Sequence, residues 1–242
     1  MDLIFHENIP WDVITDQLPG CQCDTVCSQA CPCIANSGAT YTKDGRLLCY
    51  DGPLFECNSV CTCSGACSHR LVQHSLSSNI VPVYSVAERP IVGQCLIAAR
   101  DLDVGEFICV YFGEVIPYEE ACRREEQQLE TFGRNYILIM QIFAGETLAS
   151  RTCIDGDVEG PDSTKPVGRL VNHSCEPNLK VVPVHVDSAI PYAAMFTTKN
   201  IAVGAELTYD YADCVPGDKR QFSSVRCLCG SKRCHGYLPS VQ

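Results

Sequence analysis

Short apolar runs separated by polar turns make up the middle of the chain, a pattern typical of β-strands. The runs are rich in β-branched and aromatic residues and are bounded by Gly, Pro or Asp, which favours strands over buried helices. The segments DVGE (103–106) and AVGAE (202–206) predict turns that lead into strands. The predicted strands are IVPVYSV (80–86), EFICVYFGEVI (106–116), NYILIMQIF (135–143), LKVVPVHV (179–186) and AAMFTTKNI (193–201).

One segment breaks this pattern. PYEEACRREEQQLETF (117–132) begins with proline and acidic residues and lacks strand alternation, so it predicts a surface helix. GDVEGPDSTKP (156–166) has the composition of a loop. The chain as a whole therefore predicts a mainly β fold with short helices.

The composition supports a folded core and disfavours nucleic-acid binding. The 242 residues are 46% hydrophobic and 19% charged, with a net charge of −11 and a pI near 4.9. A duplex-binding domain normally carries a basic face, so a zinc-dependent nucleic-acid binder is disfavoured and a basic peptide is the better partner. No apolar run approaches the length of a membrane span, and MDLIFHENIPWDV lacks the features of a secretory signal. We therefore expect no membrane partner and a reducing, intracellular environment.

Nineteen cysteines in a reducing compartment indicate metal ligands, with zinc as the default metal. Nine of them form two groups, CQCDTVCSQACPC and CNSVCTCSGAC. A structural zinc takes four ligands, but nine thiolates satisfy three zincs if three sulfurs bridge, and the C-x-C spacings suit such a compact cluster. The segment has few large apolar residues, so its fold should depend on zinc. The nine candidate ligands are Cys21, Cys23, Cys27, Cys31, Cys33, Cys57, Cys61, Cys63 and Cys67.

The other cysteines divide into one incomplete site and several single thiols. Cys227, Cys229 and Cys234 in CLCGSKRCHG need a fourth ligand, either His235 or a distant cysteine. Cys49 lies between apolar residues and is expected to be a buried small hydrophobe. We expect core or surface thiols at positions 95, 109, 122, 153 and 214.

The segment GRLVNHSCEPN (168–178) allows two interpretations, a Cys/His nucleophilic pair or a cysteine that binds metal. The order of motifs decides between them. A nine-cysteine cluster, a strand-rich body with NHSCEPN and ELTYDY, and a C-x-C-x₄-C ending resemble the SET-domain protein lysine methyltransferases. Within them the chain is most similar to the heterochromatin-type histone H3 enzymes with pre-SET and post-SET zinc modules. The resemblance covers roughly residues 18 to 240 and implies a pre-SET part at 1–79, a SET domain at 80–213 and a post-SET part at 214–242.

The resemblance implies that small sheets surround a knotted crossing, where the NHSC stretch and the TYDY segment pass each other. S-adenosyl-L-methionine would bind on one side of the crossing, and the substrate lysine would enter from the other. Cys175 would be the fourth ligand of the post-SET zinc, giving four structural zincs with three in the pre-SET cluster. The implied cofactor-binding residues are Gly93, Gln94, Cys95, Tyr136, Arg169, Asn172 and His173.

Three tyrosines are the implied catalytic residues. Tyr211 in TYDY would lie at the methyl-transfer centre, and Tyr111 in VYFGE would line the lysine channel. Tyr209 occupies a position where the family carries Phe or Tyr, and a Tyr there favours mono- or dimethylation. Most of the catalysis would be positioning of a lysine whose ammonium form is disfavoured in an apolar channel.

The chain departs from the family where a K-G-W-G stretch is replaced within IVGQC, so that Cys95 either crowds the methionine end of the cofactor or points away. The leading hypothesis is an active histone-lysine N-methyltransferase, with lysine 9 of histone H3 as the best choice. The alternative is an inactive SET module that binds histone tails or serves as a chromatin scaffold. Either hypothesis places the protein in the nucleus on chromosomes, with nucleosomes or chromatin factors as partners and without sequence-specific binding to nucleic acid.

Overall fold

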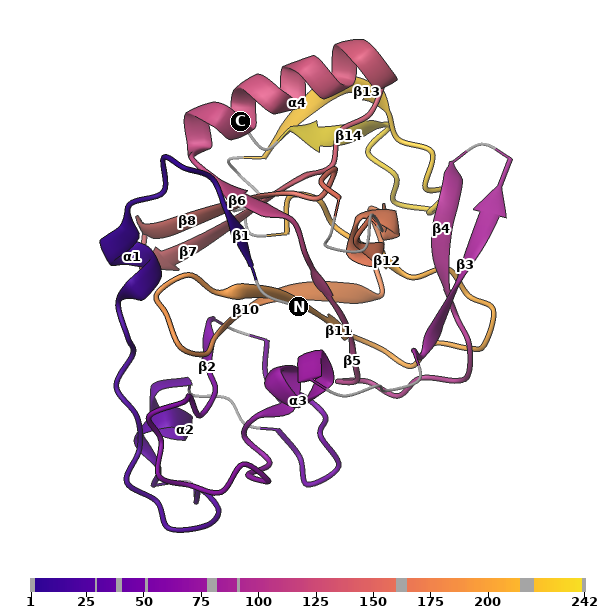
Figure 1. The fold of residues 1–242 in the computed structure, drawn as a ribbon. Helices are drawn as coiled ribbons and strands as arrows, with labels where there is room; N and C mark the ends of the chain where they lie inside the picture. Colours follow the sequence, from indigo (N-terminus) through magenta and orange to yellow (C-terminus); the bar gives the residue numbers. More distant parts are fainter. Residues whose placement is uncertain are drawn as a thin grey trace.

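The computed structural model describes residues 3–28, 30–37, 41–50, 52–77, 82–90, 92–159, 165–213 and 220–240. Within these residues the fold is mainly β with short helices, as predicted (Figure 1). The strands form two four-stranded sheets and three two-stranded ribbons. None of the described helices has the length and apolar character needed to cross a membrane.

The two sheets form the body of the molecule. The first has the order β1-β6-β8-β7, and the second has the order β2-β10-β11-β5. In the first sheet β1 pairs with β6 in parallel, with Ile4 opposite Glu114 and Phe5 opposite Val115. The remaining neighbours in this sheet are antiparallel. The strands of the first sheet are β1 (Ile4–Phe5), β6 (Glu114–Ile116), β7 (Ile137–Ala144) and β8 (Thr147–Asp155). Those of the second are β2 (Leu54–Phe55), β5 (Phe107–Tyr111), β10 (Leu179–His185) and β11 (Tyr192–Thr197).

The ribbons and helices surround this body. The ribbon β3–β4 projects at one side, the C-terminal ribbon β13–β14 lies near helix α4, and the cysteine-rich N-terminal part with α2 and α3 lies at the opposite end (Figure 1). The ribbons pair β3 (Tyr84–Arg89) with β4 (Gly93–Ala98), β9 (Asn172–His173) with β12 (Thr208–Tyr209), and β13 (Gln221–Arg226) with β14 (Tyr237–Ser240). The helices are α1 (Trp11–Thr15), α2 (Pro32–Ser37), α3 (Leu71–Ser77), α4 (Tyr118–Phe132) and the 3-10 turn η1 (Val167–Leu170).

The main apolar core joins the two sheets to the β4 strand. Leu96, Met195 and Leu207 are fully buried in it, and each such side chain contributes roughly 1.5–3 kcal/mol by leaving water. Tyr111 and Tyr209 belong to the same cluster. Two of the predicted catalytic tyrosines are therefore held by the core itself.

The predicted crossing lies where β9 pairs with β12. The pairing is parallel, with Asn172 opposite Thr208 and His173 opposite Tyr209. The Ser174 N–H extends it by donating to the Tyr209 carbonyl at 3.0 Å. The NHSC and TYDY segments are thus side by side, as the family resemblance implied.

Each of the five predicted apolar runs contains a strand, but one run contains two strands instead of one. The run 106–116 is two strands, β5 and β6, interrupted at Gly113. A Cβ at Gly113 would lie 2.0 Å from the Asp155 carbonyl oxygen, so the chain needs glycine where β8 passes. The strand in the run 80–86 begins at Tyr84, and residues 80 and 81 lie outside the described residues.

Among the strands of four or more residues, the sequence pattern missed β4, β8 and both strands of the C-terminal ribbon. The first five residues of β8 are exposed and its last four are buried, so the strand has no continuous apolar alternation. The predicted loop 156–166 carries no regular structure at 156–159 and 165–166, and its residues 160–164 lie outside the described part. The predicted turns at 103–106 and 202–206 are present, with positive φ at Gly105 and Gly204.

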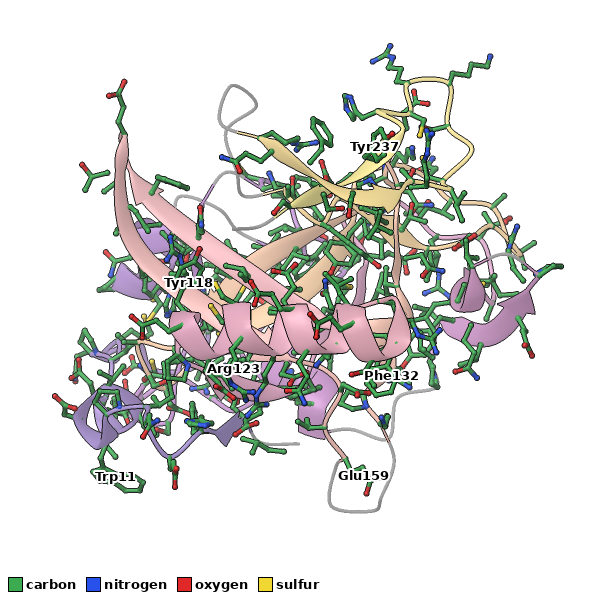
Figure 2. The ribbon with its side chains drawn as sticks, turned by 90° about the horizontal axis from the view of Figure 1, so that it is seen from above. Trp11, Tyr118, Arg123, Phe132, Glu159 and Tyr237 are labelled. Atoms are coloured by element: carbon green, nitrogen blue, oxygen red, sulfur yellow. The ribbon has the colours of Figure 1, made fainter. Side chains whose placement is uncertain are left out.

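Helix α4 confirms the predicted surface helix at 117–132. It begins after Pro117 and ends at Gly133, which adopts φ 67° and donates its N–H to the Leu129 carbonyl. Figure 2 shows the helix across one face of the molecule, with Tyr118 and Phe132 at its two ends and Trp11 projecting at the edge of the body.

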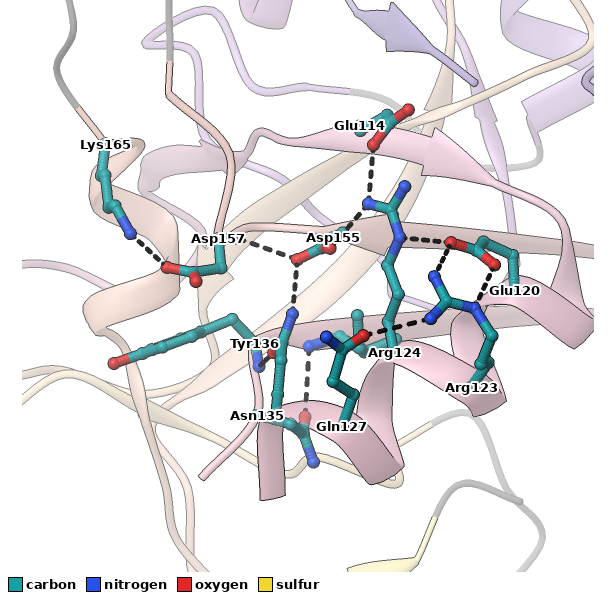
Figure 3. A network of polar contacts seen from close by, with 12 residues as sticks. Glu114, Glu120, Arg123, Arg124, Gln127, Asn135, Tyr136, Asp155, Asp157 and Lys165 are labelled. Carbon is teal, nitrogen blue, oxygen red and sulfur yellow. Dashed lines mark hydrogen bonds and ion pairs between the residues drawn. The ribbon is translucent and has the colours of Figure 1, made fainter. Parts of the chain in front are cut away.

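One arginine anchors α4 to the first sheet. Arg124 donates to Glu120 on its own helix at 2.7 Å, to Glu114 of β6 at 2.7 Å and to Asp155 of β8 at 2.8 Å (Figure 3). Gln128 also donates to Asp155, at 3.1 Å. The Asp155 side chain is only 5% exposed, so its charge depends on these donors.

The same contacts extend to a residue of the predicted site. The Gln128 amide oxygen accepts the Tyr136 N–H at 2.8 Å, and the Tyr136 carbonyl accepts the Tyr111 hydroxyl at 2.7 Å. The network therefore fixes the backbone that carries Tyr136 as well as the helix.

Replacing Arg124 tests this anchor. Arg124→Ala leaves a buried carboxylate without its cation, and we expect it to lower the free energy of unfolding by about 2–4 kcal/mol. Arg123 is the matched control, because its side chain is 61% exposed and pairs with Glu120 at the surface. Arg123→Ala should leave the free energy of unfolding nearly unchanged, because solvent screens its pair with Glu120. Urea unfolding of both variants gives the comparison, and equal losses would contradict the anchoring role.

Candidate functional site

A cavity of about 760 Å³ lies between η1, β9, the start of β4 and the C-terminal ribbon. Its volume is in the range of small-molecule sites. Six of the seven predicted cofactor-binding residues line it, together with the predicted catalytic Tyr211. The six are Gly93, Gln94, Tyr136, Arg169, Asn172 and His173.

Cys95 is the exception among the predicted cofactor-binding residues. Its side chain is fully buried and is not part of the cavity wall. Successive residues of a strand face opposite sides, and Gln94 is the neighbour that faces the cavity. The Cys95 thiol instead interacts with Arg89 and Glu206, and a contact between Cys95 and the cofactor stays a prediction.

An arginine and an aromatic ring form one wall of the cavity. The Arg169 guanidinium lies over the Tyr136 ring, 4.7 Å from its centroid, which is the geometry of a cation–π contact. Arg169 also approaches Asp157 at 3.8 Å, and Asp157 accepts from Lys165 at 2.5 Å. The buried Arg169 Nε has no hydrogen-bond partner among the described residues. This wall offers a flat surface with unused donor capacity.

Asn172 holds the opposite wall together. Its side-chain amide donates to Glu206 at 3.0 Å and, more weakly, to the Gln94 carbonyl at 3.5 Å. Glu206 is paired with Arg89 at 3.4 Å. The Asn172 side chain is thus engaged within the protein, which leaves the backbone of β9 to meet a ligand.

His173 connects the cavity to the crossing. Its Nδ1 accepts the Tyr211 N–H at 3.3 Å, and its Nε2 lies 3.4 Å from the Cys175 sulfur. Burial lowers the pKa of His173 to about 4, so the ring is neutral at pH 7. Its ring also packs edge-on against the Tyr211 ring, with centroids 5.2 Å apart.

A second, smaller cavity of about 170 Å³ lies on the other side of Tyr211. It is flanked by residues of β7, including Leu138 and Met140, and by residues of β10, including Lys180 and Val181. Tyr211 lines both cavities. The Tyr209 and Tyr211 rings stand 4.8 Å apart, and Tyr209 faces only the smaller cavity.

The burial and the position of Tyr211 determine the chemical role that its hydroxyl can have. Burial raises the pKa of the Tyr211 hydroxyl above its usual value near 10, so the hydroxyl keeps its proton at neutral pH. A protonated hydroxyl orients a neighbouring group by hydrogen bonding rather than removing its proton. Tyr211 is therefore suited to positioning at the junction of two cavities.

Tyr111 lies behind this junction. It is 3% exposed, lines neither cavity, and donates its hydroxyl to the Tyr136 carbonyl. A Cβ at Gly156 would lie 2.7 Å from the Tyr111 hydroxyl, so the ring is tightly enclosed. The contact that the structure shows for the Tyr111 hydroxyl supports the Tyr136 backbone, and its place on the lysine channel stays a prediction.

Four thiols meet beside the larger cavity. The sulfurs of Cys175, Cys227, Cys229 and Cys234 all lie within 4.8 Å of one another. A tetrahedral zinc with zinc–sulfur distances of about 2.3 Å places its sulfurs roughly 3.8 Å apart, and Cys175 and Cys227 are separated by 3.8 Å. The fourth member is the distant cysteine, because His235 contributes its backbone N–H to the Cys175 sulfur and packs its ring on Phe222.

This arrangement does not support a nucleophilic Cys175. Burial raises the pKa of Cys175, whereas an attacking cysteine needs a lowered one. His173 is a neutral neighbour within the same cluster of thiols. Four sulfurs this close fit a shared cation.

The N-terminal thiols form three overlapping groups of four. Each group has all of its sulfurs within 4.8 Å of one another. Cys57 belongs to all three, while Cys21 and Cys27 each belong to two. The groups are Cys21, Cys27, Cys31 and Cys57; Cys21, Cys33, Cys57 and Cys61; and Cys27, Cys57, Cys63 and Cys67.

Polar donors surround these sulfurs. Arg70 is buried, donates to the Cys57 and Asn58 carbonyls at 3.1 and 3.0 Å, and reaches the Cys63 sulfur at 3.5 Å. The Cys61 sulfur accepts the backbone N–H groups of Cys21 and Asn58, both at 3.2 Å. Such donors stabilise thiolates, as a cluster of metal ligands requires.

Most of the single thiols are placed as predicted. Cys95, Cys109 and Cys153 are buried, and Cys122 is half-buried. Cys49 is only half-buried, although it packs against a smaller apolar cluster that includes Leu54 and Phe196, as an apolar residue would. Position 214 lies outside the described residues.

Several lining residues were missed by sequence reasoning. Leu228 and Cys229 of the C-terminal segment close the larger cavity, and Tyr50 and Pro53 from the N-terminal part border the smaller one. An apolar residue between two metal-ligand candidates, Leu228, was an available signal, and its side chain is 57% exposed. No sequence signal identifies Tyr50 or Pro53.

Comparison with known proteins gives two family matches. The Pre-SET motif matches residues 4–70, and the SET domain matches residues 93–212. The probable histone-lysine N-methyltransferase set-23 of Caenorhabditis briggsae is 34% identical over 230 residues, covering 93% of this chain and 88% of the relative.

Two solved structures share the fold. The methyltransferase domain of human histone-lysine N-methyltransferase SETMAR has a TM-score of 0.74 and 29% identity, covering 99% of this chain and 90% of that one. KRYPTONITE, in complex with DNA, an H3(1-15) peptide and SAH, has a TM-score of 0.71 and 26% identity, covering 98% of this chain and 46% of that one.

Proposed function

Because this chain belongs to the SET-domain histone-lysine N-methyltransferases, we propose that it methylates a lysine of histone H3, with lysine 9 as the first choice. The observation that carries the proposal is the position of Tyr211 in the wall between the larger and the smaller cavity. Methyl transfer needs a donor and an acceptor that approach one reacting centre from opposite sides. Two cavities that meet at one tyrosine provide that arrangement.

The larger cavity fits S-adenosyl-L-methionine, which supplies a sulfonium methyl group when it is bound. The flat Arg169–Tyr136 wall and the β9 backbone suit an adenosyl group, and the unpartnered Arg169 Nε leaves a donor available. Gly93, where φ is 75°, allows the chain to approach closely without a Cβ. The buried Cys95 does not reduce the space for the cofactor.

The smaller cavity fits the substrate lysine. A free lysine has a pKa of about 10.4, and an apolar channel favours its neutral, nucleophilic form. Leu138 and Met140 supply apolar surface, and Tyr211 with its retained proton can orient the amine. The rate enhancement then comes mainly from alignment of the amine with the methyl group.

The strand edges beside this cavity fit an extended peptide. β7 is the outer strand of the first sheet, and the start of β10 has an open edge because β2 pairs only with Val184 and His185. A histone tail can add its backbone to such an edge. Asp210 and Asp213 at the cavity and the net charge of −11 favour a basic tail. The H3(1-15) peptide bound by KRYPTONITE includes position 9 and supports the choice of substrate.

The cysteine groups fit four structural zincs, three at the N-terminal end and one at the C-terminal end. We assign Cys21, Cys27 and Cys57 as bridging sulfurs because they recur among the groups. Cys23 interacts with the thiols of Cys31, Cys27 and Cys21, so it completes the site that contains those three. Each zinc then has two bridging and two terminal ligands, which uses all nine sulfurs.

The proposal also covers location and organisation. A histone substrate places the protein in the nucleus on chromosomes, with nucleosomes or chromatin factors as further partners. We divide the chain into a pre-SET part at 1–79, a SET domain at 80–213 and a post-SET part at 214–242. Gln94 in place of the family's Trp leaves one competing function, a histone-binding module without activity.

Incubating the zinc-loaded protein with labelled cofactor and core histones tests the proposed function. Mass spectrometry should locate the methyl group on one H3 lysine. Tyr211→Phe removes the hydroxyl at the junction, and we expect it to lower the transfer rate at least about 100-fold. Cofactor binding by calorimetry separates the two functions: no binding at millimolar cofactor would rule out the enzyme and favour the histone-binding module.

Tyr209 sets the number of methyl groups in this proposal. Its hydroxyl at the smaller cavity occupies space that a second or third methyl group needs. Tyr209→Phe should therefore shift the product from mono- or dimethyl-lysine towards trimethyl-lysine, measured by mass spectrometry after exhaustive reaction. An unchanged product distribution would show that another group limits methylation.

Cysteine substitutions test the assignment of zinc. Cys175→Ser should reduce the zinc content from four to about three per chain, because it removes one ligand from one site. Cys57→Ser should release more than one zinc, because a bridging sulfur serves two sites. Cys49→Ser is the matched control and should keep all four. Zinc is counted by elemental analysis of the purified proteins, and equal losses for Cys57 and Cys175 would exclude the bridging role.

A further inference from the structure

The contacts of His173 extend beyond the cofactor cavity in two directions. Its Nδ1 is the acceptor that the described residues provide for the Tyr211 N–H, at 3.3 Å. Its Nε2 lies 3.4 Å from the sulfur of Cys175, which belongs to the C-terminal group of four thiols. One ring therefore touches both the backbone of the junction tyrosine and a metal-ligand candidate.

The donors and acceptors determine which ring nitrogen carries the proton. A backbone N–H can only donate, so Nδ1 must be the bare nitrogen when it accepts from Tyr211. With Nδ1 bare, the ring proton is on Nε2, which points at sulfur. A sulfur bound to metal is a thiolate, and a thiolate can only accept. Both contacts require the same tautomer.

The neighbouring charged groups do not compete for the ring. Asp210 approaches Nδ1 only at 3.8 Å, and its carboxylate is engaged by Arg220 at 2.7 Å and by the Ala212 N–H at 3.1 Å. Arg220 also reaches the Ala212 carbonyl at 3.3 Å. His235 contributes its backbone N–H to the Cys175 sulfur rather than to His173. His173 is left with Tyr211 and Cys175 as its two partners on these nitrogens.

We infer that His173 is a positioning residue that transmits the geometry of the C-terminal metal site to Tyr211. The inference rests on the proposed function, and it adds that zinc at the C-terminal site acts on the rate of transfer through this ring. The bound Cys175 fixes the ring through Nε2–H, and the ring fixes the Tyr211 backbone through Nδ1. Groups that hydrogen-bond to metal ligands orient those ligands, and replacing such groups lowers metal affinity or activity.

Two substitutions separate the two contacts of His173. The side-chain oxygen of Asn lies as many bonds from Cα as Nδ1 does, so His173→Asn keeps an acceptor for Tyr211 and loses the contact with sulfur. The side-chain nitrogen of Gln lies as many bonds from Cα as Nε2 does, so His173→Gln keeps a donor to sulfur and loses the acceptor. His6→Gln, at a half-buried position that lines neither cavity, is the control.

The two variants should fail in different measurements. His173→Gln should lower kcat at least about tenfold more than His173→Asn does. His173→Asn should release the C-terminal zinc to a chelator about 10–100-fold faster than the wild-type protein, and His173→Gln should release it more slowly than His173→Asn. Equal effects of the two variants on kcat and on zinc release would overturn the inference, because a merely structural histidine would not separate them.

Nitrogen NMR of the wild-type protein tests the tautomer without any loss of folding. The protein has six histidines, and the His173→Asn spectrum identifies the signal of His173 by its disappearance. The zinc-loaded protein should show a protonated Nε2 and a bare Nδ1, and the opposite tautomer would overturn the inference. This measurement and zinc release do not require methyl transfer, so a failure of the proposed function is seen separately as an absence of transfer by the wild-type protein.

Discussion

The parallel pairing of β9 with β12 is the contact on which the site depends. It places Asn172 and His173, which line the larger cavity, beside Tyr209 and Tyr211, which line the smaller one. The pairing is only two residues long on each strand, so side chains and neighbouring amides must support it. The Ser174 N–H donates to Tyr209, and the Tyr211 N–H donates to His173. The buried core around Leu207 fixes the strand from the other side.

Grouped cysteines take the place of an apolar core in the two regions that have few large apolar residues. The cluster of buried side chains in the N-terminal part consists almost entirely of cysteines, with Ile34 as its other buried member. At the C-terminal end, one ligand comes from the SET body and three come from the tail. The tail also supplies Leu228 to the larger cavity, so the segment that completes this group of thiols also closes the cavity.

The sequence predicted those features that are local, and missed those that arise only in three dimensions. The apolar runs of β7, β10 and β11 and the helix α4 carry strong periodic patterns, and all four are present. β8 was missed because half of it faces solvent. The place of Cys175 beside the C-terminal thiols followed from family motifs, since no spacing connects positions 52 residues apart. The positions of Tyr111 and Cys95 depend on which side of a strand each faces, and Tyr50 reaches the smaller cavity only through the packing of distant elements.

The origin of Cys175 in the body of the domain has a consequence for synthesis on the ribosome. Domains form as the chain emerges, from the N-terminus onwards. The N-terminal groups of thiols are complete once Cys67 has emerged, whereas Cys175 must wait for Cys234 before its group has four members. A nascent or truncated chain therefore contains both tyrosines of the junction but lacks one wall of the cofactor cavity. On this view the larger cavity stays open until the cysteines at 227–234 have left the ribosome, even when the rest of the domain has already folded.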